Sequence, residues 1–329
     1  MTDSVQWQHF EPTTLARAAS EDRLVLLLIT APWCQHCRDL MSTSFADPGV
    51  IATVEDSFIP VHVDSERRPD VNQRFGTGAW PTIAWLTPDG ELIAHDNFLD
   101  TAELHVRLER IRDAWRTDKQ NIQRRIGELW AQADDRTSQS ADTLRIEMVD
   151  DISAAIYKQF DHEHGGFGKG IKFPHAEALD FALVQVQKRD DHRMREVVTL
   201  TLDKMMESPL HDIVDGGFFR FSHTADWHSP NYEKLLDQNA LLLRSYLEAY
   251  QVFGNDAYKK TAEGIVRWML EVMRDEHSGS FAGSQDGESD YYVGSAKQRA
   301  EKEAPAIDRT VYCDANAIAA SSLFKAAAV

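Results

Sequence analysis

The stretch Ala31-Pro32-Trp33-Cys34-Gln35-His36-Cys37 decides the fold of the first part of this chain. It follows Arg23 to Thr30, an apolar run with few polar breaks, as expected for a strand that is covered on both faces. It opens the segment Cys34 to Phe45, whose pattern predicts a helix. A strand that passes directly into a helix beginning at a cysteine places Cys34 at a helix N-terminus.

That position determines the chemistry open to Cys34. The helix macrodipole puts about half a positive charge at the N-terminus. The thiolate is the attacking species, and such a site lowers a cysteine pKa from about 8.5 into the range of roughly 3.5–7.5. Two intervening residues let Cys37 reach Cys34 within the first helical turn. We therefore predict that Cys34 is a nucleophile, that Cys37 resolves the mixed disulfide, and that this redox-active disulfide is used without a separate cofactor.

Two other interpretations of the cysteine pair are weaker. A structural zinc site needs four ligands, usually two such pairs, and only the distant Cys313 remains. Two inert buried cysteines would leave the strand–Trp-Cys–helix context unexplained. His36, between the thiols, stabilises the Cys34 thiolate if it is protonated. It can equally be an exposed histidine on the helix surface.

Alternating strands and helices over residues 1–115 predict an α/β domain. Strands are expected at Val5 to Phe10, Phe58 to Val63, Thr82 to Leu86 and Glu91 to Ala94, and helices at Thr13 to Ser20 and Thr101 to about Trp115. Thr87-Pro88-Asp89-Gly90 is a strong turn signal between the last two strands. Residues 116–140 are predicted to form a linker or connecting helix. The boundary is expected around Asp134 to Asp142, which is rich in turn-forming residues.

Residues 141–329 predict a helical domain without convincing strands. Helical patterns run at about 144–160, 175–189, 192–207, 234–253, 256–274 and 314–328. Between them the pattern Asp-x-x-x-Gly-Gly/Ser-Phe recurs, beginning at Asp161, Asp212 and Asp275. Each glycine lets the chain leave a helix in a left-handed conformation, and each Phe can fill the gap between helix pairs. We predict helical hairpins stacked around an axis, with three unrelated helix ends as the alternative.

The first domain resembles the thioredoxin fold. Trp-Cys-x-x-Cys after a buried strand is followed by Trp80-Pro81-Thr82, as in thioredoxins. The resemblance implies a cis Pro81 whose backbone pairs with an extended substrate, and a substrate site formed by Trp33, His36, Trp80 and Pro81. Thioredoxins carry a buried acidic residue six positions before the first cysteine, where this chain has Leu28. That departure implies slower or different redox chemistry unless Asp64 or a water takes over the proton transfer.

Nearly the whole chain is similar to the family of thioredoxin-like proteins fused to a six-hairpin toroid, which includes spermatogenesis-associated and bacterial YyaL proteins. The segments that carry this likeness are Asp64 to Asp70, Gly78 to Pro81, Leu86 to Gly90, Gly165 to Gly168, Lys172 to Pro174, Asp215 to Phe218 and Tyr232 to Leu236. The resemblance implies an α/α toroid like those of sugar epimerases and glycosidases. In those domains acidic and aromatic residues hold sugars, and a carboxylate pair can act as general acid and base.

The candidates for such a toroid site are Asp215, Trp227, Glu233, Asp237, Asp286 and Glu288. Each can also be a loop cap or a surface charge. Two departures weaken a sugar role. Pro230-Asn231-Tyr232-Glu233-Lys234 replaces the family's Pro-His-Phe-Glu-Lys, and Ser284-Gln285-Asp286-Gly287 replaces its Asp-Ala-Asp-Ser.

Composition limits the partners. The formal net charge of −18 over 329 residues argues against nucleic acid and anionic membranes, which both need a basic face. The polar start lacks a signal peptide, and the apolar run Leu24 to Ile29 is far shorter than the ~20 residues of a membrane helix. Three cysteines are too few for a disulfide framework. These features favour the cytoplasm.

Three repeats make about half a toroid, and the chain ends in an apolar helix, Ala315 to Val329. We expect either a longer natural chain or a second copy that closes the apolar seam, which would make a homodimer through the helical domain.

The sequence leaves three functions open. The first is a thiol–disulfide oxidoreductase whose partners are protein or small disulfides and a reductase. The second is an adaptor or holdase that binds clients in the thioredoxin groove without catalysis. The third is a carbohydrate-binding or epimerase-like toroid with an accessory thioredoxin domain.

Overall fold

A computed structural model describes residues 4–139 and 145–329. The chain divides into two compact units, Met1–Thr143 and Leu144–Val329. The predicted boundary stretch Asp134 to Asp142 lies partly outside the described residues. As far as Gln139 its backbone is helical. The placement of the boundary in or around this stretch stays a prediction.

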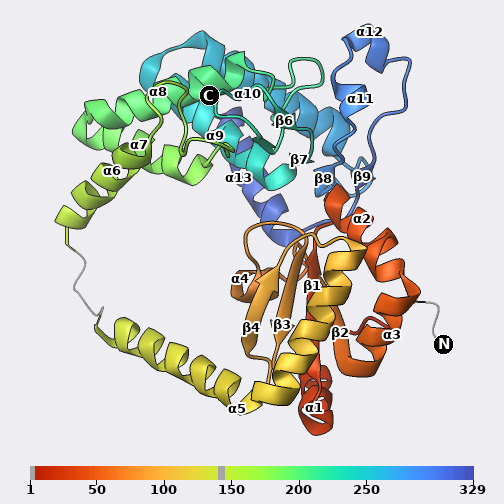
Figure 1. Ribbon diagram of the computed structural model, residues 1–329. Coiled ribbons are helices and arrows are strands. Elements are labelled where there is room, and N and C mark those ends of the chain that lie inside the picture. Colours follow the sequence, from red (N-terminus) through yellow and green to blue (C-terminus); the bar gives the residue numbers. More distant parts are fainter. Residues whose placement is uncertain (1–3, 140–144) are drawn as a thin grey trace. The chain divides into compact units, whose positions relative to one another are not determined.

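A four-stranded sheet forms the centre of the first unit (Figure 1). The strand order is β2-β1-β3-β4, with β1 parallel to β2 and antiparallel to β3, and β3 antiparallel to β4. The strands are β1 (Leu24–Thr30), β2 (Phe58–Asp64), β3 (Thr82–Leu86) and β4 (Leu92–Asp96). The strand predictions from Arg23 to Ala94 are confirmed to within two residues.

Helices cover both faces of this sheet. Helices α1 (Pro12–Glu21) and α4 (Pro69–Phe75) contribute to the core that contains Val25, Leu27 and Ile29 of β1. The alternate residues of β1, Leu24, Leu26 and Leu28, face the core built by α2 (Gln35–Ser42), α3 (Pro48–Ser57) and α5 (Thr101–Gln139). Because successive strand residues point to opposite faces, both sets are buried, which explains the unbroken apolar run.

Three predictions in this unit need correction. The helix expected over Cys34 to Phe45 ends at Ser42, and a 3-10 turn, η1 (Ser44–Ala46), follows it. A further helix, α3, was missed, although Asp47 caps it by accepting from the N–H groups of Gly49 and Val50. The strand expected over Val5 to Phe10 is reduced to a single bridge between Gln8 and Val61. Helix α5 runs far beyond Trp115, with non-helical backbone at Asp118.

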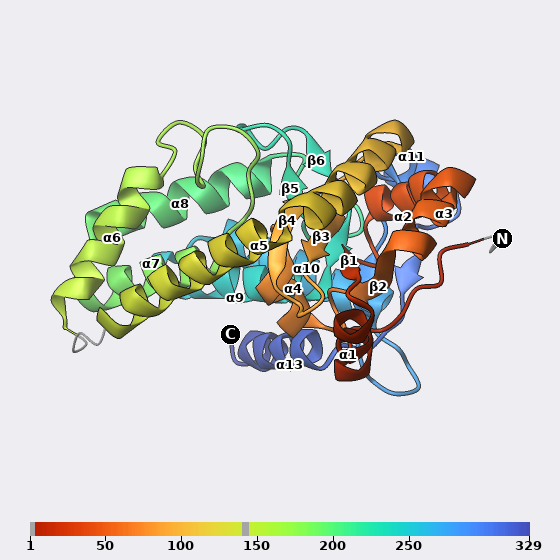
Figure 2. The ribbon, with the colours of Figure 1, turned by 60° about the horizontal axis from the view of Figure 1, so that its bottom comes forward.

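The second unit is a helical domain (Figure 2). Helix α9 packs mainly against α7, α10 and α13 and also touches α8, while α8 packs on α7 and α6 packs on α8. All six predicted helices are present: α6 (Glu147–Gln159), α7 (Ala176–Arg189), α8 (His192–Glu207), α9 (Leu236–Phe253), α10 (Asp256–Trp268) with a π-helical turn η2 (Met269–Met273), and α13 (Cys313–Ala327). Short connections make hairpins of α7–α8 and α9–α10, as predicted.

The expectation of no strands in this unit was wrong. The connections between helices hold two small sheets of two-residue strands: β5 (Phe221–Ser222) with β6 (Pro230–Asn231), and β7 (Lys234–Leu235), β8 (Ser284–Gln285) and β9 (Ile307–Asp308). Two short helices, α11 (Ser289–Tyr292) and α12 (Ala296–Arg299), lie between β8 and β9. Strands of two residues are too short to produce a readable alternation of apolar and polar side chains.

The internal repeat is confirmed by identical backbone bonds. Antiparallel bridges join Phe160 to Phe167, His211 to Phe218 and Arg274 to Phe281, always seven residues apart. In each copy the glycine four residues after the aspartate donates its N–H to the aspartate carbonyl, at 2.8, 2.9 and 2.8 Å. The alternative of three unrelated helix ends does not account for this correspondence.

The predicted apolar seam has a counterpart along α10 and α13. A groove of about 480 Å³ is lined mainly by apolar side chains, among them Leu247, Val266, Leu270 and Leu323. A homodimer through this face stays a prediction.

Candidate functional site

Cys34 occupies the N-cap position of α2, as the sequence predicted. Its Sγ accepts a hydrogen bond from the backbone N–H of Cys37 at 3.1 Å. An N–H that points at sulfur at the positive end of a helix favours the thiolate over the thiol. Cys34 and Cys37 are both buried, with exposed fractions of 4% and 3%. The loop therefore holds the two cysteines in one helical turn, close to the surface but largely covered.

The peptide bond between Trp80 and Pro81 is cis, which confirms the expectation drawn from the thioredoxin resemblance. The Asn97 side chain, which sequence reasoning missed, fixes the loop before it. Its amide donates to Thr77 Oγ1 and to the Pro81 carbonyl, both at 2.9 Å. Thr82 adds a bond from its hydroxyl to the Ala79 carbonyl at 2.8 Å. Side chains on both sides of the loop thus hold the backbone that leads into β3.

Aromatic rings lie beside the dithiol segment. The Trp33 and Trp80 rings meet edge to face, with 5.2 Å between their centroids. His36 is exposed on α2, and its ring lies 5.9 Å from that of Phe98. Phe98 has an exposed fraction of 43% and was not predicted, although a large apolar residue just after a strand is a usable signal.

Neither Leu28 nor Asp64 supplies a buried acid behind the cysteines. Leu28 is fully buried in the apolar core. Asp64 faces the following loop, where it accepts from the Glu66 N–H at 2.9 Å and lies 3.6 Å from the Arg67 Nε. The register places His62 opposite Leu28, on the same face of the sheet, and His62 Nε2 is hydrogen-bonded to Thr30 Oγ1 at 2.7 Å. Burial lowers the pKa of His62, so a neutral imidazole lies on the face that α2 covers.

The toroid candidates differ in their surroundings. Asp215 belongs to a buried ion cluster, in which its Oδ2 lies 2.7 Å from Arg299 Nη1. Glu233 is largely buried and lies 3.4 Å from Arg220. Asp237 stands at the start of α9, where burial, followed by the charges of Asp314 and Glu177, raises its pKa. Asp286 follows β8 and is half-buried, while Glu288 is exposed.

Trp227 belongs to the core. Its ring is fully buried, and its Nε1–H donates to the His164 carbonyl at 2.8 Å. A Cβ added to Gly166 would lie 2.5 Å from this ring, so the glycine is required for the contact. The ring is therefore not placed to stack on a sugar at the surface.

Sequence reasoning missed the centre of the ion cluster. Asp212 binds Lys234 Nζ at 2.6 Å and Arg299 Nη1 at 2.9 Å. Burial alone would raise the pKa of Asp212, but Lys234 and Arg299 outweigh burial and hold it below its ordinary value. The repeated aspartate was the available signal, whereas Arg299 lies 87 residues away.

Metal-binding clusters and membrane-spanning helices are absent from the described ranges 4–139 and 145–329. They contain no group of three or more His, Cys, Asp or Glu side chains arranged to hold a metal ion. No helix in them combines the length and apolarity needed to cross a membrane.

Comparison with known proteins agrees with this geometry. Residues 1–134 match the family model Thioredox_DsbH, described as "Protein of unknown function, DUF255". Spermatogenesis-associated protein 20 of Homo sapiens is 28% identical over 312 residues, which cover 87% of this chain and 39% of that protein. The chain thus spans about two fifths of the length of this curated relative.

Two solved structures are each similar to less than half of the chain. A DsbH oxidoreductase is 13% identical with a TM-score of 0.31, covering 33% of this chain and 85% of its own. Cellobiose 2-epimerase from Spirochaeta thermophila is 17% identical with a TM-score of 0.37, covering 45% of this chain and 42% of its own. Residues 1–134 thus match the Thioredox_DsbH family model, and the chain is similar to spermatogenesis-associated protein 20 over 87% of its length.

Proposed function

We propose that this protein is a thiol–disulfide oxidoreductase that acts through Cys34 and Cys37 on protein or small disulfides. The observation that carries the proposal is the N-cap position of Cys34, whose Sγ accepts the Cys37 N–H at 3.1 Å. A thiolate in that position is the attacking species in disulfide exchange. The match of residues 1–134 to a DsbH-type thioredoxin model supports the same assignment.

The reaction runs in two exchanges. The Cys34 thiolate attacks one sulfur of the client disulfide, the client S–S bond breaks, and the departing client thiolate takes up a proton. Cys37 then loses its proton and attacks Cys34, which releases the second client thiolate, also to be protonated. The client gains two electrons and two protons, and the chain is left with a Cys34–Cys37 disulfide. A dithiol reductase must restore the pair, or a client dithiol does so when the exchange runs in reverse.

The surroundings of the cysteines suggest how a client is held. Trp80 and the exposed Phe98 offer aromatic surface near the dithiol segment, whereas Trp33 is buried with its ring against that of Trp80. His36 is exposed between the two cysteines. We expect an extended client segment to lie against Pro81, with its apolar side chains on these rings. A reducing compartment such as the cytoplasm is the setting in which we expect the exchange to occur.

Trapping tests the proposal. Cys37→Ser should accumulate mixed disulfides with clients at Cys34, while the matched variant Cys34→Ser should accumulate none. The wild-type chain should reduce insulin, and alkylation of Cys34 should titrate well below pH 8.5. Trapping also tests access, because the exposed fraction of Cys34 is 4%.

Two outcomes would contradict the proposal. If Cys34→Ser reduces insulin as well as the wild type, the dithiol is not the active group. If a Cys34→Ser/Cys37→Ser double variant keeps client binding and the wild type turns over nothing, the thioredoxin groove serves as an adaptor.

A further inference from the structure

Two of the three repeats hold the same buried clamp of aspartate, glycine carbonyl and lysine. In the first clamp Lys172 Nζ donates to Asp161 Oδ2 at 2.7 Å and to the Gly165 carbonyl at 2.6 Å. In the second clamp Lys234 Nζ donates to Asp212 Oδ2 at 2.6 Å and to the Gly216 carbonyl at 2.8 Å. Both lysines are fully buried.

The backbone around the two aspartates is also the same. Asp161 Oδ1 accepts the N–H groups of the residues two and three positions later, at 3.0 and 3.1 Å. Asp212 Oδ1 accepts the equivalent pair at 3.1 and 3.4 Å. Each lysine lies over a tryptophan ring, Lys172 over Trp227 and Lys234 over Trp268, at 5.9 and 5.8 Å. The two clamps can therefore be compared atom by atom.

The second clamp carries one additional group, a guanidinium. Arg299 Nη1 lies 2.9 Å from both carboxylate oxygens of Asp212 and 2.7 Å from Asp215 Oδ2. Its remaining nitrogens donate to the carbonyls of Gly294 and Tyr292. Arg299 belongs to α12, in the long connection between β8 and β9, so a segment from elsewhere in the chain brings it to the turn.

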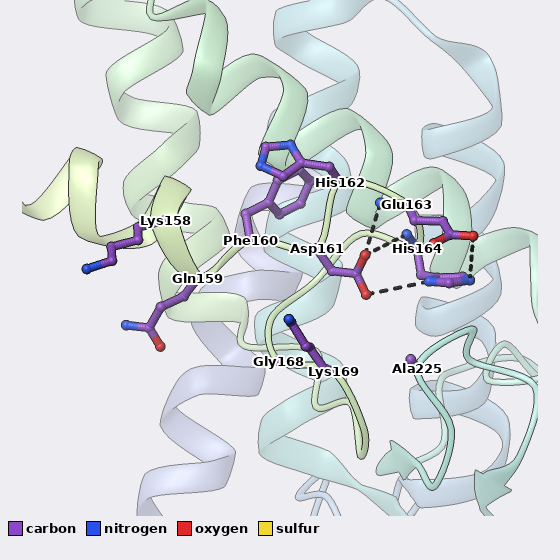
Figure 3. Close-up of a pocket in the computed structure, with 10 residues that line it drawn as sticks. All are labelled: Lys158, Gln159, Phe160, Asp161, His162, Glu163, His164, Gly168, Lys169 and Ala225. Atoms are coloured by element: carbon purple, nitrogen blue, oxygen red, sulfur yellow. Dashed lines mark hydrogen bonds and ion pairs between the residues drawn. The ribbon is translucent and has the colours of Figure 1, made fainter.

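The first clamp opens instead into a cavity of about 660 Å³ (Figure 3). Asp161, Glu163 and His164 line it, and no arginine does so among the described residues. His164 stands where the second repeat has Asp215. Its imidazole lies between two carboxylates, with Nδ1 3.5 Å from Asp161 Oδ2 and Nε2 3.8 Å from Glu163 Oε1. The contacts that Asp212 makes with its lysine and with two backbone N–H groups thus all have counterparts at Asp161. The contacts with a guanidinium have none.

We propose that this cavity binds a guanidinium group, the side chain of an arginine presented by a protein or peptide partner. Its carboxylates, Asp161 and Glu163, suit the planar fork of a guanidinium better than a compact ammonium. The pKa of Asp161 lies well below its ordinary value, because Lys172 and two backbone N–H groups outweigh burial, so this carboxylate is charged at neutral pH. Lys158 and Lys169 also line the cavity and are exposed, and their positive charges repel a guanidinium. Binding should therefore be sensitive to salt, which screens these charges.

A titration of the full chain with Nα-acetyl-arginine amide tests this proposal, followed by the amide NMR signals of residues 161–168. The neutral isostere Nα-acetyl-citrulline amide and the lysine analogue are the comparison ligands. We expect saturable shifts with the arginine ligand, none with the citrulline ligand, and weaker binding of the lysine ligand. Equal binding of the arginine and lysine ligands, or no shifts with arginine, would overturn the proposal.

Variants on the cavity wall make the test quantitative. His164→Asp places a carboxylate where the second clamp has Asp215, and we expect it to bind the arginine ligand about tenfold more tightly. Glu163→Gln should weaken binding several-fold, and Lys169→Gln should strengthen it. These residues are partly or largely exposed, so the substitutions leave the buried Asp161–Lys172 pair in place. If His164→Asp leaves the affinity unchanged, the equivalence of the two clamps as guanidinium sites is wrong.

Discussion

Asp212→Asn should destabilise the helical unit severely, because it removes the one carboxylate that contacts both buried cations of the second clamp. The Lys234 side chain is 0% exposed and that of Asp212 is 1% exposed, so water cannot replace the lost charge. Arg299 keeps Asp215, but Lys234 keeps only the Gly216 carbonyl and the neutral amide. Breaking a buried pair by removing one partner costs about 3–5 kcal/mol. We therefore expect the equilibrium constant for unfolding to rise by about 10³-fold.

The ionisation of Lys234 shows separately that its burial is costly even with Asp212 beside it. Burial lowers its pKa to about 8, against the opposing attraction of Asp212. The gap from 10.5 in the unfolded chain corresponds to about 3 kcal/mol, at about 1.4 kcal/mol per unit of pH. Between these two values the unfolded chain binds more protons than the folded one, so the free energy of unfolding should rise as the pH increases from about 8 to 10.5. Lys234→Met should remove that rise.

Urea unfolding measured by hydrogen exchange of α8 and α9 amides gives the stability of this unit separately from the thioredoxin unit. The matched variant Asp161→Asn should cost about half as much, because the Asp161 side chain is 15% exposed and has no arginine partner in the described chain. The double variant Asp212→Asn/Lys234→Met should recover at least about 1 kcal/mol, because it removes the uncompensated ammonium. If Asp212→Asn lowers the free energy of unfolding by less than about 1 kcal/mol, the reasoning that it leaves Lys234 as an uncompensated buried charge is refuted.

Three further outcomes are expected. Gly216→Ala should prevent folding of the helical unit, because a Cβ there would lie 2.1 Å from the Gly264 carbonyl oxygen at a φ of +91°. Gly254→Ala, with a φ of +67° and no atom within 4 Å of the added Cβ, should cost only about 1 kcal/mol, and thermal unfolding compares the two. Asn239→Ala should lower the free energy of unfolding by about 3 kcal/mol, because the buried N–H and C=O of Phe218 lose their hydrogen-bond partner. Asn316 is only half-buried, so Asn316→Ala should cost less in the same urea titration. Burial lowers the pKa of His62 in the folded thioredoxin unit, so the wild type should lose free energy of unfolding as the pH falls below about 6.5. His62→Gln should reduce this dependence of stability on pH.

Local patterns predicted the fold of the first unit well, because its decisive signals lie within short windows. The apolar run of β1, the Pro-Asp-Gly turn and the position of Cys34 at the start of a helix each depend on neighbours within a few residues. The same holds for the six long helices and for the repeated turns. The two-residue strands could not be predicted, because they exist only through pairing with distant segments. The four-residue helices α11 and α12 are too short to show a helical period in the sequence.

The site divides in the same way. Spacing along the chain was enough to predict that two thiols share the first turn of a helix and that an Asp-Gly-Gly-Phe turn recurs. The packed fold was needed to show that Trp227 is a core residue and that Asn97 fixes the loop before β3. It was also needed to show that Arg299 completes one clamp while the other opens into a cavity. Those contacts join residues from 16 to 87 positions apart. No local preference encodes them, because they depend on which backbone surfaces the packed helices bring together.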